Sequence, residues 1–336
     1  MRADQAHAPS ASAHAFRAAS PSDSQPSDSQ PADGQLTAPS APPTPASSAH
    51  AAIPVEANPE GWQARLSLEF ARRRAGTSLV RSLHQGPLRV QRAFYPEGCD
   101  GPCHVYVLHP PGGIVSGDQL LLDVRLEPQS QVLLTAPGAN KLYRARTGSS
   151  ASLLARFSAA QGASVEWLPP EMIAFAGTHT RVRTQIELAP DATYAGWDIL
   201  CLGRPAAGES FTHGELKTEL SLERAGKLAY FERGHYRGGD QALSARWGLA
   251  GQPVLGTFIV AAPGACAGWV ERVREEVAIA DNESGAFAVT LVSGILIARY
   301  LGSSTRQARA LFERTYGVLR PLYAGLSAVH PRIWST

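Results

Sequence analysis

The sequence predicts a mainly β protein whose layered strands stack in a β-helical, solenoid-like manner, with a few C-terminal helices and a disordered N-terminal tail. Three observations support this prediction. Apolar and polar residues alternate with the period of a half-buried strand in segments that recur roughly every 30 residues. Helical periodicity appears only late in the chain, and the first residues are rich in Ala, Ser and Pro.

The predicted tail covers residues 1–58. It contains the direct repeat PSDSQ at 21–25 and 26–30. A segment so poor in large apolar side chains cannot bury enough surface to offset the entropy lost on ordering. We therefore expect disorder over 1–58 and a β domain with C-terminal helices over 59–336.

Four segments show the alternating pattern, and each is followed by a turn and a second strand. The first strands are expected at 120–126, 153–157, 182–188 and 216–222. The second strands are expected at 131–135, 164–168, 193–200 and 228–232. A repeated unit of strand, tight turn, strand and long loop indicates strands that stack their apolar faces on one another. An ordinary antiparallel sandwich, whose successive hairpins would give similar spacings, is the alternative.

Two helices and one long strand are expected toward the C-terminus. The helices are expected at about 269–280 and at 305–319, where apolar residues fall on one face. Ser304 and Gln307 resemble a capping box at the start of the second helix, and Pro321 is expected to stop it. The nearly continuous apolar run 286–301 predicts a strand buried on both faces.

Composition argues against several functional classes. The 31 basic and 29 acidic residues give a formal net charge of +2, too balanced to predict a nucleic-acid or anionic-membrane binder. No apolar run approaches the roughly 18 residues that a membrane span needs. Four cysteines are too few for a disulfide framework in 336 residues, which favours a reducing compartment and a cytoplasmic location.

The Gly-rich stretch 109–118 is the most unusual local feature. It lacks the Gly-Lys-Ser/Thr of a phosphate-binding loop and does not match the dinucleotide fingerprint. Its serine falls one place late for a nucleophile elbow. The sequence therefore predicts no nucleotide or hydrolase chemistry here. The glycines can equally shape a tight connection before the strand at 120.

Residue types that bind metals gather just before and within this stretch: Cys99, Cys103, His104 and His109. Cysteine and histidine suit Ni²⁺ and Zn²⁺ alike. The spacing fits no standard zinc site, so Cys99, Cys103 and His104 are a weaker candidate metal site and could equally belong to an ordinary loop.

Carboxylates recur near the ends of the second strands. These residues are Glu166, Glu171, Asp198 and Glu232. Stacked repeats would align some of them along one side, where they could bind or pass a divalent cation weakly. The alternative is that they are solvated or form ion pairs with Arg204, Arg233 and Arg237.

Several extended blocks follow one another along the chain: GPLRVQRAFYPEG at 86–98, CHVYVLHPPGG at 103–113, LTAPGANKLYR at 134–144, EWLPPE at 166–171 and GWDILCLGRP at 196–205. The final residues are PRIWST at 331–336. These blocks and this end resemble the signature blocks and the usual end of the UreD (UreH) family of urease accessory proteins. The resemblance covers residues 62–336.

This resemblance implies a β-helical fold and a non-catalytic chaperone that helps to insert nickel into apo-urease. It implies the partners UreF, the GTPase UreG, the apo-urease subunits and the nickel donor UreE, with GTP hydrolysis assigned to UreG. Ni²⁺ would be bound transiently and no cofactor permanently. It also implies an internal nickel channel, for which Asp118 and Glu171 are candidate residues because both stand in signature blocks.

The C-terminal region around Leu311, Phe312, Tyr316 and Trp334 is the candidate docking surface for UreF, because an amphipathic helix can add contacts without altering the β core. The alternative is that this apolar face packs on the β layers. Two rival functions remain. A carbohydrate-active β-helix would need a pair of catalytic carboxylates, whereas a general assembly scaffold differs only in its partner.

Overall fold

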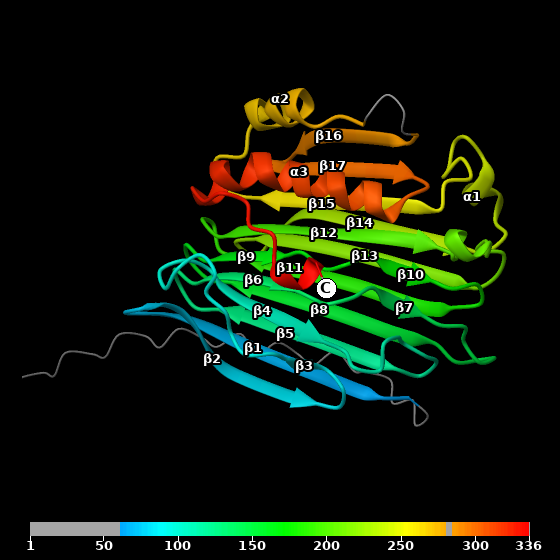
Figure 1. The fold of residues 1–336 in the computed structure, drawn as a ribbon, viewed down its shortest axis with the longest axis horizontal. Coiled ribbons are helices and arrows are strands. Elements are labelled where there is room, and N and C mark those ends of the chain that lie inside the picture. Colours follow the sequence, from blue (N-terminus) through cyan, green and yellow to red (C-terminus); the bar gives the residue numbers. More distant parts are fainter. Residues whose placement is uncertain (1–60, 280–283, 336) are drawn as a thin grey trace, which may run out of the picture. The chain divides into compact units, whose positions relative to one another are not determined.

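The computed structural model describes residues 61–279 and 284–335, so the predicted tail lies outside the described residues. The mainly β prediction is confirmed (Figure 1). The strands are β1 Gln63–Arg73, β2 Gly76–Gln85, β3 Arg89–Val90, β4 Cys103–Leu108, β5 Gln119–Leu126, β6 Gln131–Thr135, β7 Asn140–Leu142, β8 Ala151–Ala159, β9 Ser164–Trp167, β10 Met172–Ala174, β11 His179–Leu188, β12 Thr193–Leu202, β13 Glu215–Arg224, β14 Lys227–Arg237, β15 Val254–Ala261, β16 Ala286–Val292 and β17 Ile295–Gly302. The helices are α1 Gln241–Ser244, α2 Ala267–Glu276 and α3 Thr305–Ala324, with 3-10 turns at Pro205–Ala207 and Arg332–Ser335.

The strands form two sheets. Sheet I has the order β14-β13-β11-β8-β5-β1-β2, and its central strands β1, β5, β8, β11 and β13 are parallel. Sheet II has the order β16-β17-β15-β12-β9-β6-β4-β3, with parallel strands from β4 to β12. The remaining pairs along this order are antiparallel. The short strands β7 and β10 lie off this order, and β10 pairs parallel with both β12 and β7.

The repeat predicted from the sequence corresponds to one turn of the chain around the two sheets. The chain passes from β5 in sheet I to β6 in sheet II, returns to β8, crosses to β9, and repeats the cycle with β11 and β12. Equivalent positions of successive repeats therefore lie side by side, as Leu120, Leu153 and Val182 do. The solenoid-like arrangement is confirmed, because an antiparallel sandwich would not have parallel neighbours in both sheets.

The fourth repeat departs from the prediction. Its second strand, β14, does not cross to sheet II but pairs antiparallel with β13 at the edge of sheet I. The turn explains the difference, because Ala225 and Gly226 both have positive φ, at 51° and 72°. Two consecutive positive φ values make the two-residue turn of a tight hairpin, which returns the chain along the same sheet.

The single strand predicted at 286–301 is wrong. This run forms the antiparallel hairpin β16–β17, which turns at Ser293 and Gly294, where φ is again positive for both residues. Only β17 has the burial of a central strand, whereas β16 lies at the edge of sheet II and is half exposed. The apolar run is therefore two strands with different surroundings.

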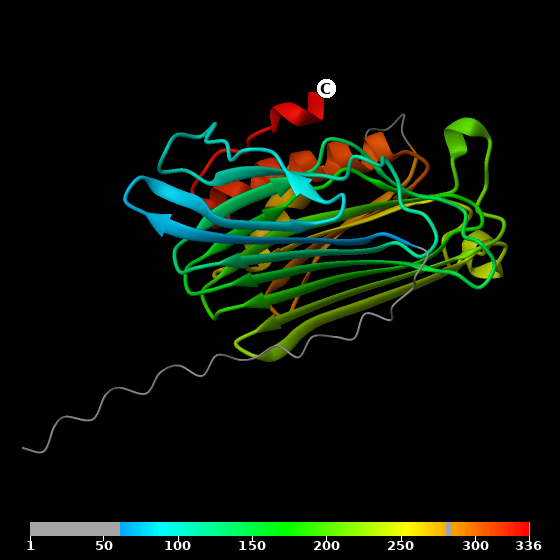
Figure 2. The same ribbon diagram turned by 90° about the horizontal axis from the view of Figure 1, so that it is seen from below.

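Helices α2 and α3 cover the outer face of sheet II, so the layers run from sheet I through sheet II to the helices. Figure 2 shows this order, with the yellow-green β13–β14 hairpin far from the orange-red α3. One apolar cluster lies between the sheets, and a second lies between sheet II and the helices. No helix in 61–279 or 284–335 is long and apolar enough to cross a membrane.

Helix α3 is longer than predicted. Ser304 caps its start as expected, since its hydroxyl accepts a hydrogen bond from the Gln307 N–H. Pro321 does not stop it: the helix continues to Ala324, and Gly325 ends it in the left-handed conformation. Pro321 is exposed, so the helical hydrogen bond that it cannot donate is lost on the solvent side, while buried neighbours hold the last turn on the sheet.

Candidate functional site

A cavity of about 610 Å³ lies between the two sheets. Much of its wall is apolar, but several polar side chains face it. On sheet I the cavity runs across the strands, because a row of residues that pair with one another on successive strands lines it from β5 to β14. That row is Leu122, Ala155, Thr184, Leu220 and Glu232.

On sheet II a second row points toward sheet I, and two of its three residues, Asp198 and Thr257, line the cavity. Asp198 on β12, Thr257 on β15 and Arg299 on β17 are direct register partners. Their neighbours Ile199, Phe258 and Ala298 belong to the apolar cluster under the helices. Because side chains alternate along a strand, Asp198, Thr257 and Arg299 must point the other way, toward sheet I.

Glu232 and Arg299 form an ion pair across the two sheets. The two Nη–Oε distances are 2.8 and 2.9 Å, and the Tyr230 hydroxyl donates to the same carboxylate at 2.6 Å. Burial alone would raise the pKa of Glu232, but the hydrogen bonds from Arg299 and Tyr230 outweigh it and lower that pKa. Glu232 is therefore an ionised carboxylate that already has partners.

Asp198 is the contrasting carboxylate. No hydrogen bond or ion pair engages its side chain within the described residues. Protein surrounds the Asp198 side chain on all sides, but the side chain is still accessible to solvent because it faces the cavity. Burial, and then the charge of Glu232, raise the pKa of Asp198 to about 6. Such a group is well placed to receive a cation.

His109 lines the other end of the cavity, with the neighbouring loop residues Pro110 and Gly112. It comes from the Gly-rich stretch that the sequence singled out. Partial burial lowers its pKa, while the charge of Asp118 acts weakly in the opposite direction. The cavity thus has a neutral imidazole toward one end and the carboxylates of Asp198 and Glu232 toward the other, while Lys141, Arg183 and Glu219 also belong to its lining.

The two channel candidates predicted from the sequence are engaged elsewhere. Asp118 is buried, and its carboxylate accepts hydrogen bonds from the backbone N–H groups of Trp62 and Val115, both at 2.9 Å. Glu171 forms an ion pair with Arg309 of α3 at 2.7 Å. Neither belongs to the described lining of the cavity, and their role in nickel transfer stays a prediction.

The cysteines of the weaker metal site lie apart from its histidine. Cys99 is exposed in a loop, whereas Cys103 and His104 are adjacent on β4 and so point to opposite faces. The Cys103 thiol contacts the Tyr95 hydroxyl, and His104 Nε2 contacts Glu97. Within 61–279 and 284–335 no three His, Cys, Asp or Glu side chains are grouped so that they could hold a metal ion.

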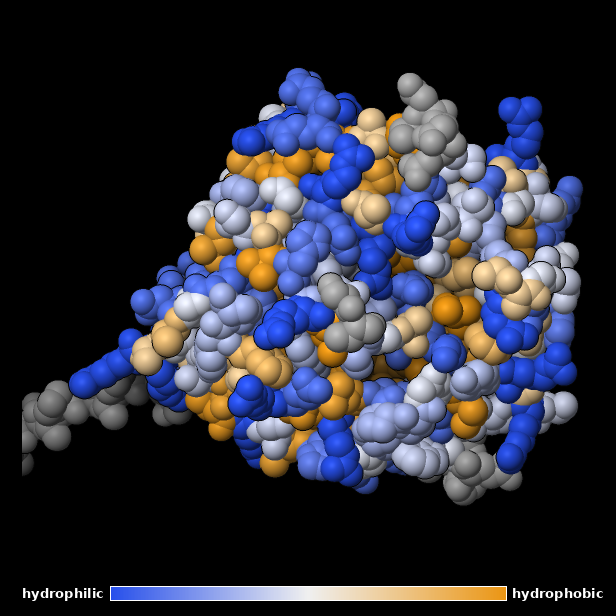
Figure 3. Space-filling view, in the orientation of Figure 1, coloured by the Kyte–Doolittle hydropathy of each residue, from blue (hydrophilic) through white to orange (hydrophobic). Residues whose placement is uncertain are grey.

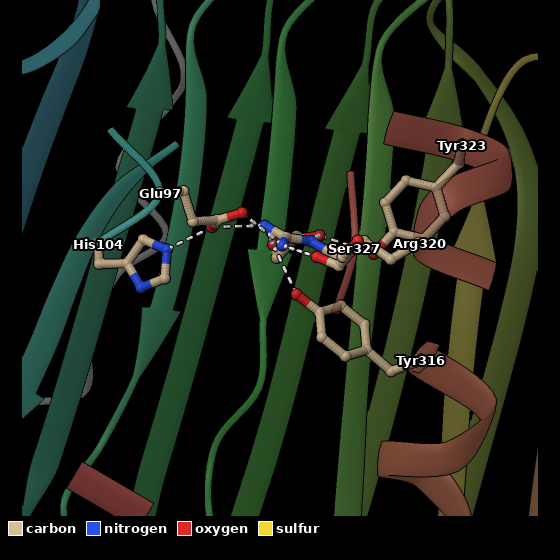
Figure 4. A network of polar contacts seen from close by, with 7 residues as sticks. Glu97, His104, Tyr316, Arg320, Tyr323 and Ser327 are labelled. Atoms are coloured by element: carbon tan, nitrogen blue, oxygen red, sulfur yellow. Dashed lines mark hydrogen bonds and ion pairs between the residues drawn. The ribbon is translucent and has the colours of Figure 1, made fainter. Parts of the chain in front are cut away.

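A buried network around Arg320 joins sheet II to α3 (Figure 4). Glu166 of β9 belongs to this network, since it accepts a hydrogen bond from Arg320 Nε at 2.9 Å. Arg320 is fully buried, and all its N–H groups have acceptors: both Glu97 oxygens, both Glu166 oxygens and the Ser327 carbonyl. The hydroxyls of Tyr316 and Tyr323 also donate to Glu166. This carboxylate is paired, as the alternative reading expected, but with an arginine 154 residues away.

Glu97 makes this network sensitive to acid. Burial favours its neutral form, but hydrogen bonds from His104 and Arg320 outweigh burial and lower the pKa of Glu97 from 4.5 to about 2. A depressed carboxyl pKa contributes stability above the unfolded value and loses it as pH falls toward the folded value.

We therefore expect Glu97 to contribute a loss of stability as pH falls from 4.5 to about 2. Urea unfolding midpoints measured across this range should fall less steeply for Glu97→Gln than for the unchanged chain. Glu223→Gln, at an exposed site of β13, is the matched control and should keep the original slope. Equal slopes for the chain and Glu97→Gln would contradict the assignment.

Three of the four predicted docking residues are buried, and the fourth is half-buried. Leu311, Phe312 and Tyr316 are buried against sheet II, so they can reach a partner only if α3 leaves the sheet. Trp334 is half-buried; its ring packs on Trp197, and its indole N–H donates to Thr135 Oγ1 at 2.8 Å. The face of α3 that remains accessible is the opposite one.

Sequence reasoning identified Asp198 and Glu232 but missed Arg299 and the Arg320 network. Arg299 has a visible signal, since it is the one charged residue in the apolar segment 295–301. Arg320 gave no comparable signal, because charged residues are common on helices. Its two carboxylate acceptors, Glu97 and Glu166, come from distant parts of the chain.

Comparisons with known proteins show to which family the chain belongs. Residues 63–335 match the family model described as UreD urease accessory protein. A urease accessory protein UreD from Azoarcus sp. strain BH72 is 45% identical over 287 residues, covering 85% of this chain and 96% of that protein. The corresponding proteins of Methylobacillus flagellatus and Dechloromonas aromatica are 43% and 44% identical, each over 82% of this chain and 95% of the relative. The chain belongs to the UreD family of urease accessory proteins.

Proposed function

We propose that this accessory protein is a non-catalytic chaperone that conducts nickel into apo-urease. It binds apo-urease and acts with UreF and the GTPase UreG, which hydrolyses GTP, while UreE supplies the nickel; these steps take place in the cytoplasm. The observation that carries this proposal is the inter-sheet cavity with the unpaired Asp198 carboxylate.

The lining of the cavity suits a cation in transit. Carboxylate oxygens and a single imidazole can each contribute a ligand to Ni²⁺, but soft thiolates, which would hold the ion firmly, do not face the described part of the cavity. An apolar wall between polar ends gives the ion few places to stop. Passage needs binding that is favourable enough for entry and weak enough for release.

One end of this path reaches the surface near Glu232. The side chains of Arg299 and Glu232 are 47% and 30% exposed, although both face the space between the sheets. Asp118 and Glu171 stay candidates for the route beyond the cavity. Their contacts favour supporting roles, Asp118 in fixing the turn before β5 and Glu171 in holding α3.

The proposal is tested by co-expressing apo-urease, UreF, UreG and UreE with and without this chain in medium that contains nickel. We expect nickel content and urease activity to depend on the chain. Nickel-loaded urease in its absence would show that it has another role, such as a general scaffold. A pull-down of the complex shows whether assembly itself was achieved.

We place the UreF contact on the accessible face of α3. On the molecular face in Figure 3, apolar side chains are scattered among polar ones. The outward stripe of α3 contains Arg306, Ala310, Arg314, Gly317 and Pro321. Arg314 bends toward α2, where it donates to the carbonyls of Glu276 and Ala278, and Ala310 and Gly317 are small enough for a partner helix to approach closely. This revises the earlier candidate region, whose apolar residues face the sheet.

Ala310→Arg is therefore expected to weaken UreF capture by about tenfold or more, because a long charged side chain would stand in the middle of a close contact. Circular dichroism should show an unchanged fold, since Ala310 is exposed. Ala288→Arg, at an exposed position of β16, is the control. Equal capture by the two variants would place the contact elsewhere.

A further inference from the structure

Arg299 connects the two sheets at one side of the cavity. It lies on β17 of sheet II, and its guanidinium reaches Glu232 and the Tyr230 hydroxyl on β14, the edge strand of sheet I. Its Nη1 also lies 3.4 Å from Thr257 Oγ1, which fixes the side chain from its own sheet. A part-exposed ion pair therefore spans the gap between β14 and β17.

The ion pair with Arg299 engages Glu232, which is one of the two carboxylates that a cation in the cavity would bind. Each Glu232 oxygen accepts from a different Nη of Arg299, and the Tyr230 hydroxyl donates to Oε2. A divalent cation that approaches Glu232 meets a fixed positive charge before it meets a free oxygen pair. Asp198 lies on the same face of sheet II, two strands from Arg299, and has no such partner among the described residues.

We propose that Arg299 is the gate of the cavity: its ion pair with Glu232 closes the side between β14 and β17, and an arriving divalent cation must displace it to bind Asp198 and Glu232 together. This inference rests on the proposed passage of nickel. It adds that Arg299 serves as the counter-ion of Glu232 and keeps cation affinity low until this ion pair opens.

A purely structural cross-link is the competing interpretation of this ion pair. A cross-link would affect stability without affecting cation affinity. A gate makes the opposite prediction for affinity, because removal of the guanidinium frees Glu232. Binding of Ni²⁺ alone to the full-length chain, measured by titration calorimetry, separates the two interpretations.

The gate predicts that Arg299→Gln binds Ni²⁺ about tenfold more tightly than the unchanged chain, because it removes a positive charge that lies in contact with the ligand. Adding Glu232→Gln to that variant should abolish the gain. Arg272→Gln removes an exposed ion pair on α2 and is the matched control, with unchanged affinity expected. Affinity of Arg299→Gln equal to that of the unchanged chain would overturn the gate.

Two further variants keep the test decisive. If Arg299→Gln does not fold, Arg299→Lys keeps the charge but cannot make the two-pronged contact, so a smaller gain is expected and no gain counts against the gate. Asp198→Asn tests the passage itself. Unchanged Ni²⁺ binding in Asp198→Asn and Glu232→Gln would remove the channel, whereas weakened binding in both without a gain in Arg299→Gln would remove the gate alone.

Discussion

Replacing Arg320 with leucine should lower the free energy of unfolding by roughly 3–5 kcal/mol, the usual cost of removing one partner from a buried ion pair. Arg320 is fully buried and joins Glu97 to Glu166. Leucine would leave both carboxylates buried without their counter-ion. Urea unfolding followed by circular dichroism measures the loss.

Arg309→Leu provides a matched control on the same helix. Arg309 also pairs with one carboxylate, Glu171, but both side chains are more than a fifth exposed. Water can solvate Glu171 after that replacement, so we expect a loss of about 1 kcal/mol or less. Equal losses for the two variants would show that the Arg320 network does not hold α3 on sheet II.

The network also predicts a rescue. Replacing Arg320, Glu97 and Glu166 together with apolar residues of similar volume should recover most of the lost stability, since no unpaired charge remains buried. Tyr316 and Tyr323 would lose their acceptor in this variant, which makes full recovery unexpected. A triple variant less stable than Arg320→Leu would contradict this account.

Asp198→Asn should lower the nickel content of co-expressed urease by about tenfold or more, because loss even of groups that support a metal ligand commonly costs that much affinity. Asparagine keeps the shape of the side chain but not its charge. The site is not part of the described apolar packing, so assembly with UreF and urease should persist. Nickel content by atomic absorption and a pull-down of the complex measure the two effects.

Two matched variants compare the effect of Asp198 on nickel loading with the effects of other carboxylates. Glu223→Gln removes a carboxylate from the outer face of sheet I and should leave nickel loading unchanged. Glu171→Gln should weaken loading less than Asp198→Asn, because Glu171 already pairs with Arg309. Full nickel loading with Asp198→Asn would remove Asp198 from the route, while a larger effect of Glu171→Gln would restore the original candidate.

The parallel coil was predictable because its cause is local. Alternation with period two and short turns recur along the chain, and equivalent residues then stack, as Leu120 and Leu153 do. The two errors in strand placement had a local cause as well. Ala225-Gly226 and Ser293-Gly294 adopt tight hairpin turns. Ala and Ser are not typical of positive φ, so the sequence does not indicate these turns.

The candidate site was only half predictable, for a different reason. The sequence marked Asp198 and Glu232 as carboxylates near strand ends, and alternation can assign each to a face. It could not show that Glu232 has an arginine partner 67 residues away and Asp198 none in the described structure. That distinction depends on which strands the coil brings opposite one another across the cavity.

The row from Leu122 to Glu232 also sets a length. It crosses five neighbouring strands of sheet I, one from each of β5, β8, β11, β13 and β14. Strand spacings of about 4.8 Å make this roughly 19 Å, close to two-thirds of the apolar thickness of a bilayer. Each added or deleted repeat would change this length by one strand spacing and leave the strand face unchanged. On the proposal that nickel passes along the cavity, the number of turns of the coil sets the distance between the point where a donor delivers the ion and the point where an acceptor receives it.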